Sequence, residues 1–372
     1  MKVLIINKHL LDTLGGSEMQ CDLIAKGLHA RGHEVVYGAI KIKNKSIKDY
    51  NEVPYRVVSL APGKYGYRSL LTKEQPDIIY WRHNKHNLQE FISESKKQKI
   101  PFVFAIAHVN DTLKLPPLRH LINATAGKAF YKYPIVILKN LHYFAWNHRA
   151  FKNVDAVTSV NSEYIGSLPV ANQRTIWNAV EIKTEEFNWP RPFCLWVANI
   201  KPRKRPEIFI ELSRMMGKRA LNMDFIMVGA IQDHRYHQLI NEAKKLNNFH
   251  YFGFKNPEKV NGILRKAVCL VHTCMPEGFS NNFIQAWMNQ CPTITYEFDP
   301  EKLIAGEQMG FVTGTIDEMA KKVETLAKDK SLRDEIGIRA YQFARKNFGI
   351  DRMIDEVEDL LISVINDRTA KS

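Results

Sequence analysis

The sequence predicts an α/β protein made of two Rossmann-like domains, each a doubly wound parallel sheet. Its 372 residues exceed what one hydrophobic core usually organises. Short apolar runs rich in β-branched residues recur without polar alternation, which is typical of strands buried on both faces. These runs alternate with amphipathic segments, as they do in a parallel sheet with crossover helices.

The predicted strands repeat the same rhythm in both halves of the chain. They are Val3–Ile6, Glu34–Ala39, Ile78–Tyr80, Phe102–Ile106 and Ala156–Ser159, then Phe193–Val197, Asp224–Val228, His250–Phe252, Val268–His272 and Thr293–Tyr296. Helices are expected between them, among them residues 206–216, 234–246 and 282–289. The polar, proline-containing stretch Glu181–Arg191 interrupts the alternation, so we expect domains over residues 1–180 and 181–350.

The end of the chain is expected to be helical. Residues 317–328, 332–347 and 352–366 have helical patterns, and the last segment needs an apolar partner for one face. That face carries Met353, Ile354, Val357, Leu360, Leu361 and Val364. We expect residues 351–372 to form a helix that crosses back onto the N-terminal domain, followed by a short tail.

Basic charge is concentrated in the first half. Residues 1–180 carry 25 Lys and Arg against 13 Asp and Glu, whereas residues 181–372 carry 28 against 26. Such an excess favours an anionic partner, with nucleic acid, acidic lipid and phosphorylated substrate all open. Helix-turn-helix, zinc and single-strand-binding signatures are lacking, so a nucleic-acid partner is not expected.

The compartment is predicted from the cysteines and from the apolar runs. Cys21, Cys194, Cys269, Cys274 and Cys291 are scattered and mostly apolar in setting, which suits buried thiols in a reducing cytoplasm. No export signal is recognisable, and no run approaches the roughly 20 apolar residues that span a bilayer. We expect a cytoplasmic protein whose membrane contact, if any, is peripheral, on the cytoplasmic face of an inner membrane.

Paired glycines follow the first predicted strand and precede a helix. Gly15 and Gly16 let the backbone approach a ligand, and the free amides of a helix start attract phosphate. Ser17 and Gln20 have the spacing of a capping box. A tight turn without a ligand is the alternative. The loop is neither a dinucleotide fingerprint nor a Walker phosphate loop.

The strongest motif is Pro276–Trp287, which follows a buried strand and opens a helix. The Glu277 carboxylate can accept hydrogen bonds from sugar hydroxyls. Amides near Ser280, Asn281 and Asn282 can face a diphosphate at the positive end of the helix. About one turn further, Gln285 could reach a ribose.

This motif resembles that of the retaining glycosyltransferases of family 4, the glycosyl transferases group 1, which have the GT-B fold. Their signature is Glu-Gly-Phe with a second Glu eight positions after the first. Glu277, Gly278 and Phe279 match it, and Gln285 stands at the second Glu, without its charge. The resemblance implies two domains facing across a cleft, and sugar transfer from a nucleotide sugar with retention at the anomeric carbon.

The resemblance extends over nearly the whole chain. Gly15 and Gly16 are similar to the family's N-terminal glycine loop, and His108 stands where the family places a histidine beside the transferred sugar. Residues 176–181 resemble its linker segment. Gly229 and Phe254 belong to turns similar to the two glycine turns beside the nucleotide base. The resemblance therefore implies donor contacts from both halves.

Residues 197–206 resemble the family's segment that carries a phosphate-binding lysine. Lys204 falls on that lysine, which would neutralise the departing diphosphate. Asn199 replaces the family's arginine, and Lys201 or Arg203 could supply the missing charge. A solvated basic loop is the alternative. His108, Lys204 and Glu277 are the predicted catalytic residues.

No metal or cofactor is expected. The sequence has no Asp-x-Asp pair and no His/Cys cluster with metal-ligand spacing. Lys204 and helix amides must then carry the charge of the leaving group. A catalytically silent scaffold that binds a sugar nucleotide or a protein partner is the alternative function, which Asn199 and Gln285 favour; epimerisation and phosphorolysis are further alternatives within the fold.

Residues 114–152 interleave basic, aromatic and aliphatic side chains. A segment at a membrane surface has that composition, and so do amphipathic helices packed on a sheet. We expect a saccharide or lipid-linked saccharide as acceptor, in bacterial surface polysaccharide assembly. An anionic membrane is a further expected partner, through the basic N-terminal domain.

Overall fold

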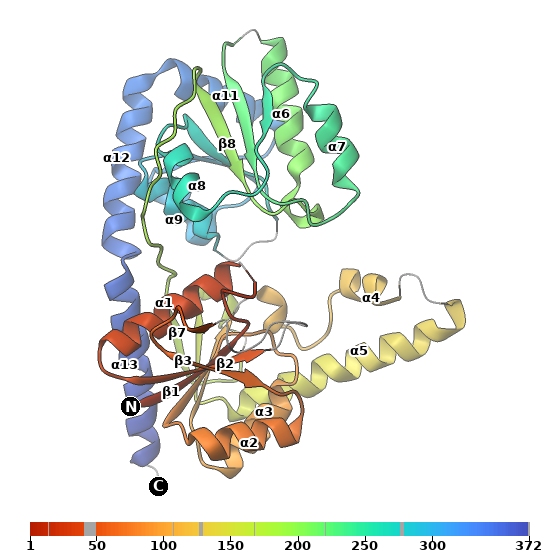
Figure 1. Cartoon of the computed structure of the whole chain (residues 1–372). Helices are drawn as coiled ribbons and strands as arrows, with labels where there is room; N and C mark the ends of the chain where they lie inside the picture. The colour runs from red at the N-terminus through yellow and green to blue at the C-terminus, as the bar shows by residue number, and fades with distance from the viewer. Residues whose placement is uncertain are drawn as a thin grey trace. The chain divides into compact units, whose positions relative to one another are not determined.

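The computed structural model describes residues 1–13, 15–40, 50–106, 108–125, 129–166, 168–219, 221–275 and 279–370 (Figure 1). The chain forms two compact units. Unit 1 comprises residues 1–178 and 350–372, and unit 2 comprises residues 179–349. Each unit contains one parallel sheet covered by helices on both faces.

The sheet of unit 1 has seven strands in the order β3-β2-β1-β4-β5-β6-β7. They are β1 (Lys2–Asn7), β2 (Glu34–Ile40), β3 (Arg56–Leu60), β4 (Ile78–Trp81), β5 (Phe102–Ile106), β6 (Ala156–Ser159) and β7 (Asn172–Thr175). The helices are α1 (Gly16–Ala30), α2 (Lys64–Glu74), α3 (Leu88–Lys97), α4 (Leu118–Thr125), α5 (Tyr133–His148) and α13 (Ile350–Thr369). In the register, Ile5 of β1 lies between Tyr37 and Tyr80.

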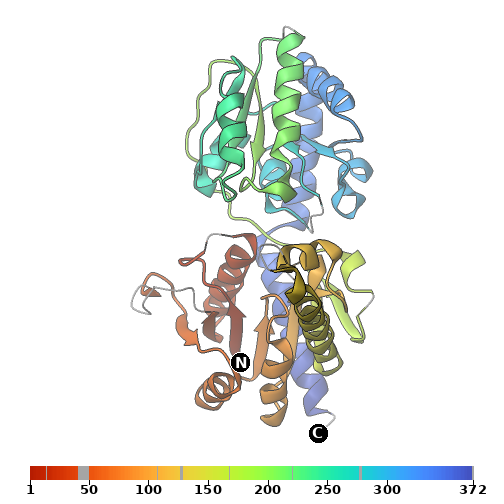
Figure 2. The same ribbon diagram turned by 90° about the vertical axis from the view of Figure 1, so that its right-hand side faces the viewer.

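The central strands of unit 1 are buried on both faces, as their unbroken apolar sequences predict. On one face, Tyr67 and Leu71 of α2 and Phe91 of α3 pack against the sheet. Helices α1 and α13 cover the other face (Figures 1 and 2). Unit 1 therefore has an apolar core on each face of its sheet, between the sheet and the helices that cover that face.

The C-terminal helix α13 packs on the N-terminal sheet unit, which confirms the prediction. All six predicted apolar residues of its inner face are buried. Gly27 of α1 lies so close to Ile354 that a Cβ there would stand 2.6 Å from the Ile354 Cδ1. Arg31 and His33, at and beyond the end of α1, contact the Glu358 carboxylate at 2.5 and 2.6 Å.

The sheet of unit 2 has six strands in the order β10-β9-β8-β11-β12-β13. They are β8 (Phe193–Val197), β9 (Asp224–Val228), β10 (Phe249–Tyr251), β11 (Cys269–His272), β12 (Thr293–Tyr296) and β13 (Gly310–Thr313). The helices are α6 (Pro206–Lys218), α7 (Tyr236–Ala243), α8 (Pro257–Leu264), α9 (Asn281–Met288), α10 (Leu303–Gly306), α11 (Ile316–Lys328) and α12 (Lys330–Asn347). Phe209 of α6 and Met319 of α11 pack on one face of the sheet.

Three strands were not predicted, and each lies at the edge of a sheet. β3 and β7 are the two edges of the unit 1 sheet, and β13 is one edge of the unit 2 sheet. Their residues are mostly half-buried or exposed, so their sequences lack the apolar runs of central strands. The five cysteines are buried free thiols, as predicted.

Helices α4 and α5 form an arm that projects from the sheet of unit 1 (Figures 1 and 2). Among the described residues no helix is long and apolar enough to cross a bilayer. The arm is inserted between β5 and β6. It corresponds to part of the basic, aromatic segment 114–152.

Candidate active site

The loop that carries Lys204 leaves the carboxyl end of β8. Residues 202–204 form a 3-10 turn, and Arg205 follows in the left-handed region at φ 50° before α6 begins. Arg205 pairs with Glu297 at 2.9 Å and lies 4.6 Å from the centre of the Tyr296 ring. The charge of Arg205 is therefore paired within unit 2, and Lys201, Arg203 and Lys204 are the other basic residues of this loop.

Thr273, directly after β11, joins this loop to the next one. Its hydroxyl accepts a hydrogen bond from Trp196 Nε1 at 2.9 Å and donates to the Lys204 carbonyl at 2.6 Å. The Met275 amide donates to the Arg203 carbonyl at 3.2 Å. The Lys204 loop therefore lies against the chain that leads into Glu277. Glu277 and Gly278 themselves lie outside the described residues.

The start of α9 is fixed beside β8. Asn282 Nδ2 donates to the Val197 carbonyl at 2.6 Å, while Ser280 occupies the N-cap without a side-chain cap. Strands β8 and β11 are neighbours at the point where the strand order changes direction. Ligands of open α/β sheets bind at such a switch point, beyond the carboxyl ends of the strands. The starts of α6 and α9 both lie there.

Two glycine turns complete this edge of unit 2. The Gly229 amide donates to the Gly253 carbonyl at 2.9 Å, which joins the turns after β9 and β10. Gly229 has φ 150°, and a Cβ on it would stand 1.8 Å from the Ala198 carbonyl oxygen. Only glycine fits this approach, which holds the Ala198–Asn199 segment beside the β9 turn. Phe254, which follows Gly253 in the turn after β10, is exposed.

Two side chains that were predicted to bind the donor point into the core of unit 2. Phe279 is buried against the rings of Phe283 and Phe348. Gln285 is 7% exposed, and its Nε2 donates to Asn261 Oδ1 at 3.3 Å. Both hold α9 in place in this structure, and their contact with a donor stays a prediction.

The glycine loop of unit 1 carries a carboxylate. Gly15 is the N-cap of α1 and makes no side-chain cap, and Gly16 is the first helical residue. A Cβ on Gly15 would stand 2.3 Å from Glu18 Oε2, so the Glu18 side chain folds back over the start of the helix. Burial raises the pKa of Glu18, against its own amide and the charges of Lys8 and Arg82. An anion at this helix start would meet a carboxylate.

The capping box predicted for α1 is wrong. The Ser17 hydroxyl donates to the Arg82 carbonyl at 3.1 Å and accepts from Asn7 Nδ2. Gln20 is fully buried. The cap position falls on Gly15, two residues earlier than the Ser-x-x-Gln spacing requires, so Ser17 instead ties α1 to the chain after β4.

His108 lies shortly after the end of β5, at the carboxyl edge of unit 1. Its backbone amide donates to Asp111 Oδ2 at 3.0 Å, and its Nδ1 accepts from the Asn110 amide at 3.1 Å. Since Nδ1 is an acceptor, the neutral ring carries its proton on Nε2. His108 is therefore a hydrogen-bond donor through Nε2.

Three basic residues at this edge escaped the sequence analysis. The buried Arg82 donates from Nη2 to Asn178 Oδ1 at 2.6 Å, while its Nε has no partner among the described residues. Burial lowers the pKa of His83 to about 4 and, against the charge of Asp111, that of Lys85 to about 8. They form the basic run Arg82-His83-Asn84-Lys85-His86, which matches no motif; only its charge and its position after the buried strand β4 could have marked it.

Residues 179–343 match the family model described as "Glycosyl transferases group 1". The match spans the two hydrogen-bonded loops after β8 and β11, which carry Lys204 and Thr273, together with the glycine turns and α9. These residues, most of unit 2, are therefore a glycosyltransferase domain of group 1. A search of the curated proteins finds no match.

Solved structures support the fold of the whole glycosyltransferase. Anabaena Alr3699/HepE in complex with UDP-glucose shares 16% identity at a TM-score of 0.71, covering 98% of this chain and 100% of that one. Sucrose-phosphate synthase of Thermosynechococcus elongatus shares 14% at 0.76, covering 98% and 99%. WaaG, a glycosyltransferase of lipopolysaccharide biosynthesis, shares 14% at 0.70, covering 97% and 99%. The predicted GT-B fold is confirmed.

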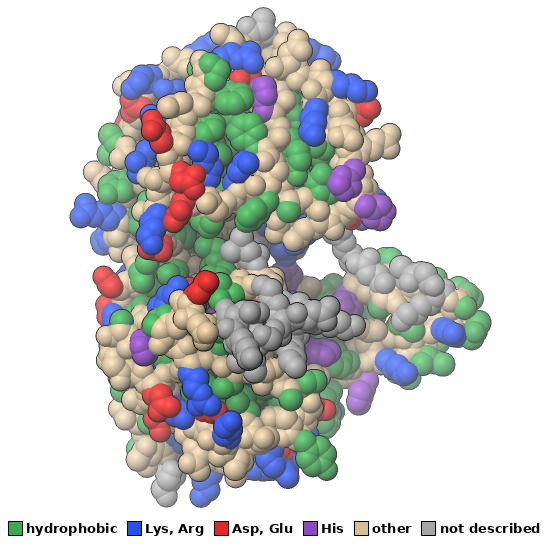
Figure 3. Space-filling model, in the orientation of Figure 1, with side chains coloured by type: hydrophobic (Ala, Val, Ile, Leu, Met, Phe, Trp, Pro, Cys, Tyr) green, Lys and Arg blue, Asp and Glu red, His purple; other side chains and the backbone are tan. Residues whose placement is uncertain are grey.

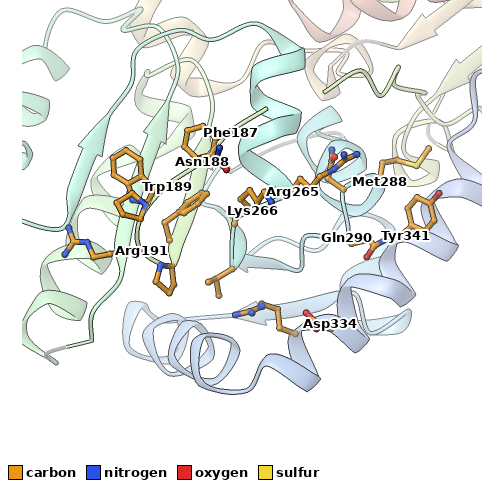
Figure 4. A pocket seen from close by; sticks show the side chains of 17 residues that line it. Phe187, Asn188, Trp189, Arg191, Arg265, Lys266, Met288, Gln290, Asp334 and Tyr341 are labelled. Carbon is orange, nitrogen blue, oxygen red and sulfur yellow. The ribbon is translucent and has the colours of Figure 1, made fainter. Parts of the chain in front are cut away.

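The glycosyltransferase also has a cavity of about 870 Å³ in unit 2 (Figure 4). Phe193 and Val268 line the cavity, so it lies at the amino ends of β8 and β11, at the edge of the sheet opposite the Lys204 and Thr273 loops. Arg265 and Lys266 lie just beyond the end of α8, where basic side chains balance the helix carbonyls. None of the predicted site residues lines it. In the described part of the chain, no cluster of three or more His, Cys, Asp or Glu could hold a metal ion.

Proposed function

We propose that the glycosyltransferase moves a sugar from a nucleotide diphosphate sugar to a hydroxyl of a saccharide or lipid-linked saccharide, with retention and without a metal ion. One observation carries the proposal. The Thr273 hydroxyl and the Met275 amide bind the Lys204 loop to the chain that enters the Glu277 motif. Two motifs that lie about seventy residues apart in the sequence therefore meet at one strand switch point, the usual ligand position in such sheets.

The chemistry follows from the charges at this edge. The bond between the anomeric carbon and the diphosphate oxygen breaks, and negative charge accumulates on the diphosphate. Lys204 and the amides at the start of α9 would stabilise that charge, the lysine as a compact cation and the helix through its dipole. The acceptor hydroxyl forms the new bond to the anomeric carbon, and its proton passes to an oxygen of the leaving diphosphate.

Unit 1 would serve the sugar and the acceptor. His108 can donate a hydrogen bond from Nε2 to a sugar oxygen. The Glu18 carboxylate over Gly15 disfavours a phosphate at α1 and favours hydroxyl donors instead. The basic excess of residues 1–180 favours an anionic membrane as the surface on which the acceptor is presented. Assembly of a bacterial surface polysaccharide at the cytoplasmic face of the membrane fits this combination.

A nucleotide-sugar screen tests the proposal. A true donor raises the melting temperature by mass action, and the shift should disappear in Gly229→Ala under conditions in which that variant is still folded. Release of nucleoside diphosphate on addition of a saccharide acceptor then shows transfer. If no nucleotide sugar and no nucleoside diphosphate shifts the melting temperature, the donor site proposed here is wrong.

A silent scaffold is the second candidate, because Asn199 and Gln285 stand where the family has charged residues. The same screen separates the two. Binding of a nucleotide sugar without release of diphosphate, over a range of saccharide and lipid-linked acceptors, would favour the scaffold. Release in the wild type and its loss in Lys204→Ala would favour the enzyme.

A further inference from the structure

The arm of unit 1 exposes an unusual concentration of apolar side chains. Of the fourteen large hydrophobic residues exposed in the described chain, eight lie between Leu115 and Trp146. Phe130 is 83% exposed, Leu118 74% and Leu138 68%. Large apolar side chains gathered on one projection mark a binding surface rather than ordinary exposure.

Helix α5 is anchored through one face only. The Asn87 amide donates to the Tyr143 hydroxyl at 3.1 Å, and the Gln89 amide donates to Asn147 Oδ1 at 3.3 Å. Phe144 is buried beneath the ammonium of Lys85, 4.4 Å from its ring centre. These contacts fix which face of α5 is turned outward.

The outward face of α5 forms a narrow mixed stripe. At about 100° per residue, its members lie within roughly 100° of the helix circumference. The members are Ile135, Leu138, Lys139, His142 and Trp146 of α5, and Arg149, which directly follows the helix. Apolar and basic side chains thus lie together along one line, and Figure 3 shows hydrophobic and basic surface together on the arm.

The net positive charge of the arm favours an anionic partner. Residues 114–152 contain seven Lys and Arg and no Asp or Glu. Lys132 lies 5.5 Å from the Tyr131 ring centre, and Arg149 lies 5.9 Å from that of Trp146. A second copy of the chain would bring the same positive charges against these. A layer of anionic headgroups above hydrocarbon matches both the charges and the apolar side chains.

We propose that the arm, in its described residues 115–125 and 129–149, is the surface through which the glycosyltransferase binds an anionic lipid bilayer, with Leu138 and Trp146 entering the interface and Lys132, Lys139 and Arg149 contacting headgroups. The proposal deepens the proposed function, on which it rests for the lipid-linked acceptor. Membrane binding itself does not depend on sugar transfer. Aromatic and aliphatic side chains next to Lys and Arg are the composition of interfacial helices.

Co-sedimentation of the full chain with vesicles tests the proposal. Vesicles of phosphatidylcholine mixed with phosphatidylglycerol in equal parts should bind the chain at low salt, and pure phosphatidylcholine should bind it far less. Leu138→Ser with Trp146→Ser should lower the affinity at least about tenfold. Lys132→Gln with Lys139→Gln should lower it roughly 25-fold, since each basic residue near an anionic surface contributes roughly fivefold.

Matched controls come from α2 of the same unit. Tyr65→Ser removes an exposed aromatic ring, and Lys64→Gln with Lys73→Gln removes two exposed charges. These variants should bind the vesicles within about twofold of the wild type. If the control charges matter as much as the arm charges, binding is diffuse and the proposal is wrong.

Insertion is measured through Trp146. Brominated lipids should quench part of the tryptophan emission of the wild type, and this part should be missing in Trp146→Phe. Equal quenching in both proteins would overturn the proposal. A mass that halves in Leu138→Ser/Trp146→Ser without any vesicle binding by the wild type would instead assign the stripe to a second copy of the chain.

The outcome is separable from that of the proposed function. Diphosphate release with a soluble acceptor, without vesicles, should be the same in the arm variants as in the wild type. If the wild type ignores anionic vesicles while release continues, the arm proposal falls and the transfer reaction stands. If the wild type binds anionic vesicles but uses no nucleotide-sugar donor, the transfer reaction falls and the arm proposal stands.

Discussion

The two sheets of the molecule share one strand order but differ in what they carry between corresponding strands. β1, β4, β5 and β6 of unit 1 correspond in that order to β8, β11, β12 and β13 of unit 2. Between β5 and β6, residues 107–155 include the exposed arm, whereas between β12 and β13, residues 297–309 form only short helical turns. The common frame sets where ligands bind, and the connections set which partners are reached.

The loops at the two carboxyl edges differ in the same way. In unit 2, backbone and hydroxyl hydrogen bonds join three loops tightly around Gly229 and Thr273. In unit 1, titratable side chains occupy the edge, among them the buried Arg82 and Lys85 and the half-buried Glu18. Backbone amides and a lysine held in tightly joined loops suit a diphosphate, and the carboxylate and imidazole groups at the edge of unit 1 suit hydroxyls.

The largest effect is expected from removing the lysine of unit 2. Lys204→Ala should lower kcat by roughly a hundredfold to a thousandfold, because the charge it neutralises is greatest in the transition state. Affinity for the nucleoside diphosphate should fall much less. Steady-state kinetics and a binding titration measure the two effects. Lys218→Ala, an exposed lysine at the end of α6, is the control and should behave as the wild type.

Gly229→Ala should break the tight edge of unit 2. Its Cβ would collide with the Ala198 carbonyl oxygen, so the free energy of unfolding should fall by about 2–4 kcal/mol and donor binding should weaken. Urea denaturation measures the first effect. In Gly253→Ala no atom crowds the new Cβ, and only the left-handed backbone is strained, at a cost of about 1 kcal/mol. Equal losses in both variants would contradict the close packing of the β8 and β9 loops.

Lys85 should give unit 1 a pH dependence of its own. Burial lowers its pKa from 10.5 to about 8, so between these values the unfolded chain binds more protons. The free energy of unfolding should therefore rise with pH over this range, by roughly 2 kcal/mol relative to Lys85→Met. Urea denaturation of both proteins at several pH values measures this. Parallel pH profiles would show that the ammonium is solvated.

The smallest effect is expected at the contact of α13 with α1. Hydrogen bonds from His33 and Arg31 lower the pKa of Glu358, so its stabilisation is present at neutral pH and is lost as the pH falls through the folded value. Glu358→Gln should cost about 1 kcal/mol at pH 7, and the difference should vanish in acid. Glu335→Gln, an exposed pair with Arg339 on one helix, should cost less than about 0.5 kcal/mol.

The fold was predictable because the central strands are apolar throughout. β1, β5, β8 and β9 each bury both faces, and only edge strands such as β7, with the sequence Asn-Gln-Arg-Thr, escaped. The inner face of α13 was predicted residue by residue, since its apolar positions follow the helical period.

The candidate site was less predictable. A motif gives the order of residues but not the direction in which each side chain points on a short helix. In α9, Asn282 caps β8 and Gln285 contacts Asn261, which only the packing of three elements decides. Arg82 belongs to no motif, and Asn178, its partner, lies far along the chain.

Hydrogen exchange with and without a nucleoside diphosphate tests the central claim most directly. We predict protection of backbone amides in residues 198–205 and 279–285, in the loops after β8 and β11 of unit 2. The exchange of amides in residues 15–20 of unit 1 should change little. Protection confined to the glycine loop of unit 1, or to residues 188–193 at the opposite edge of unit 2, would contradict the account.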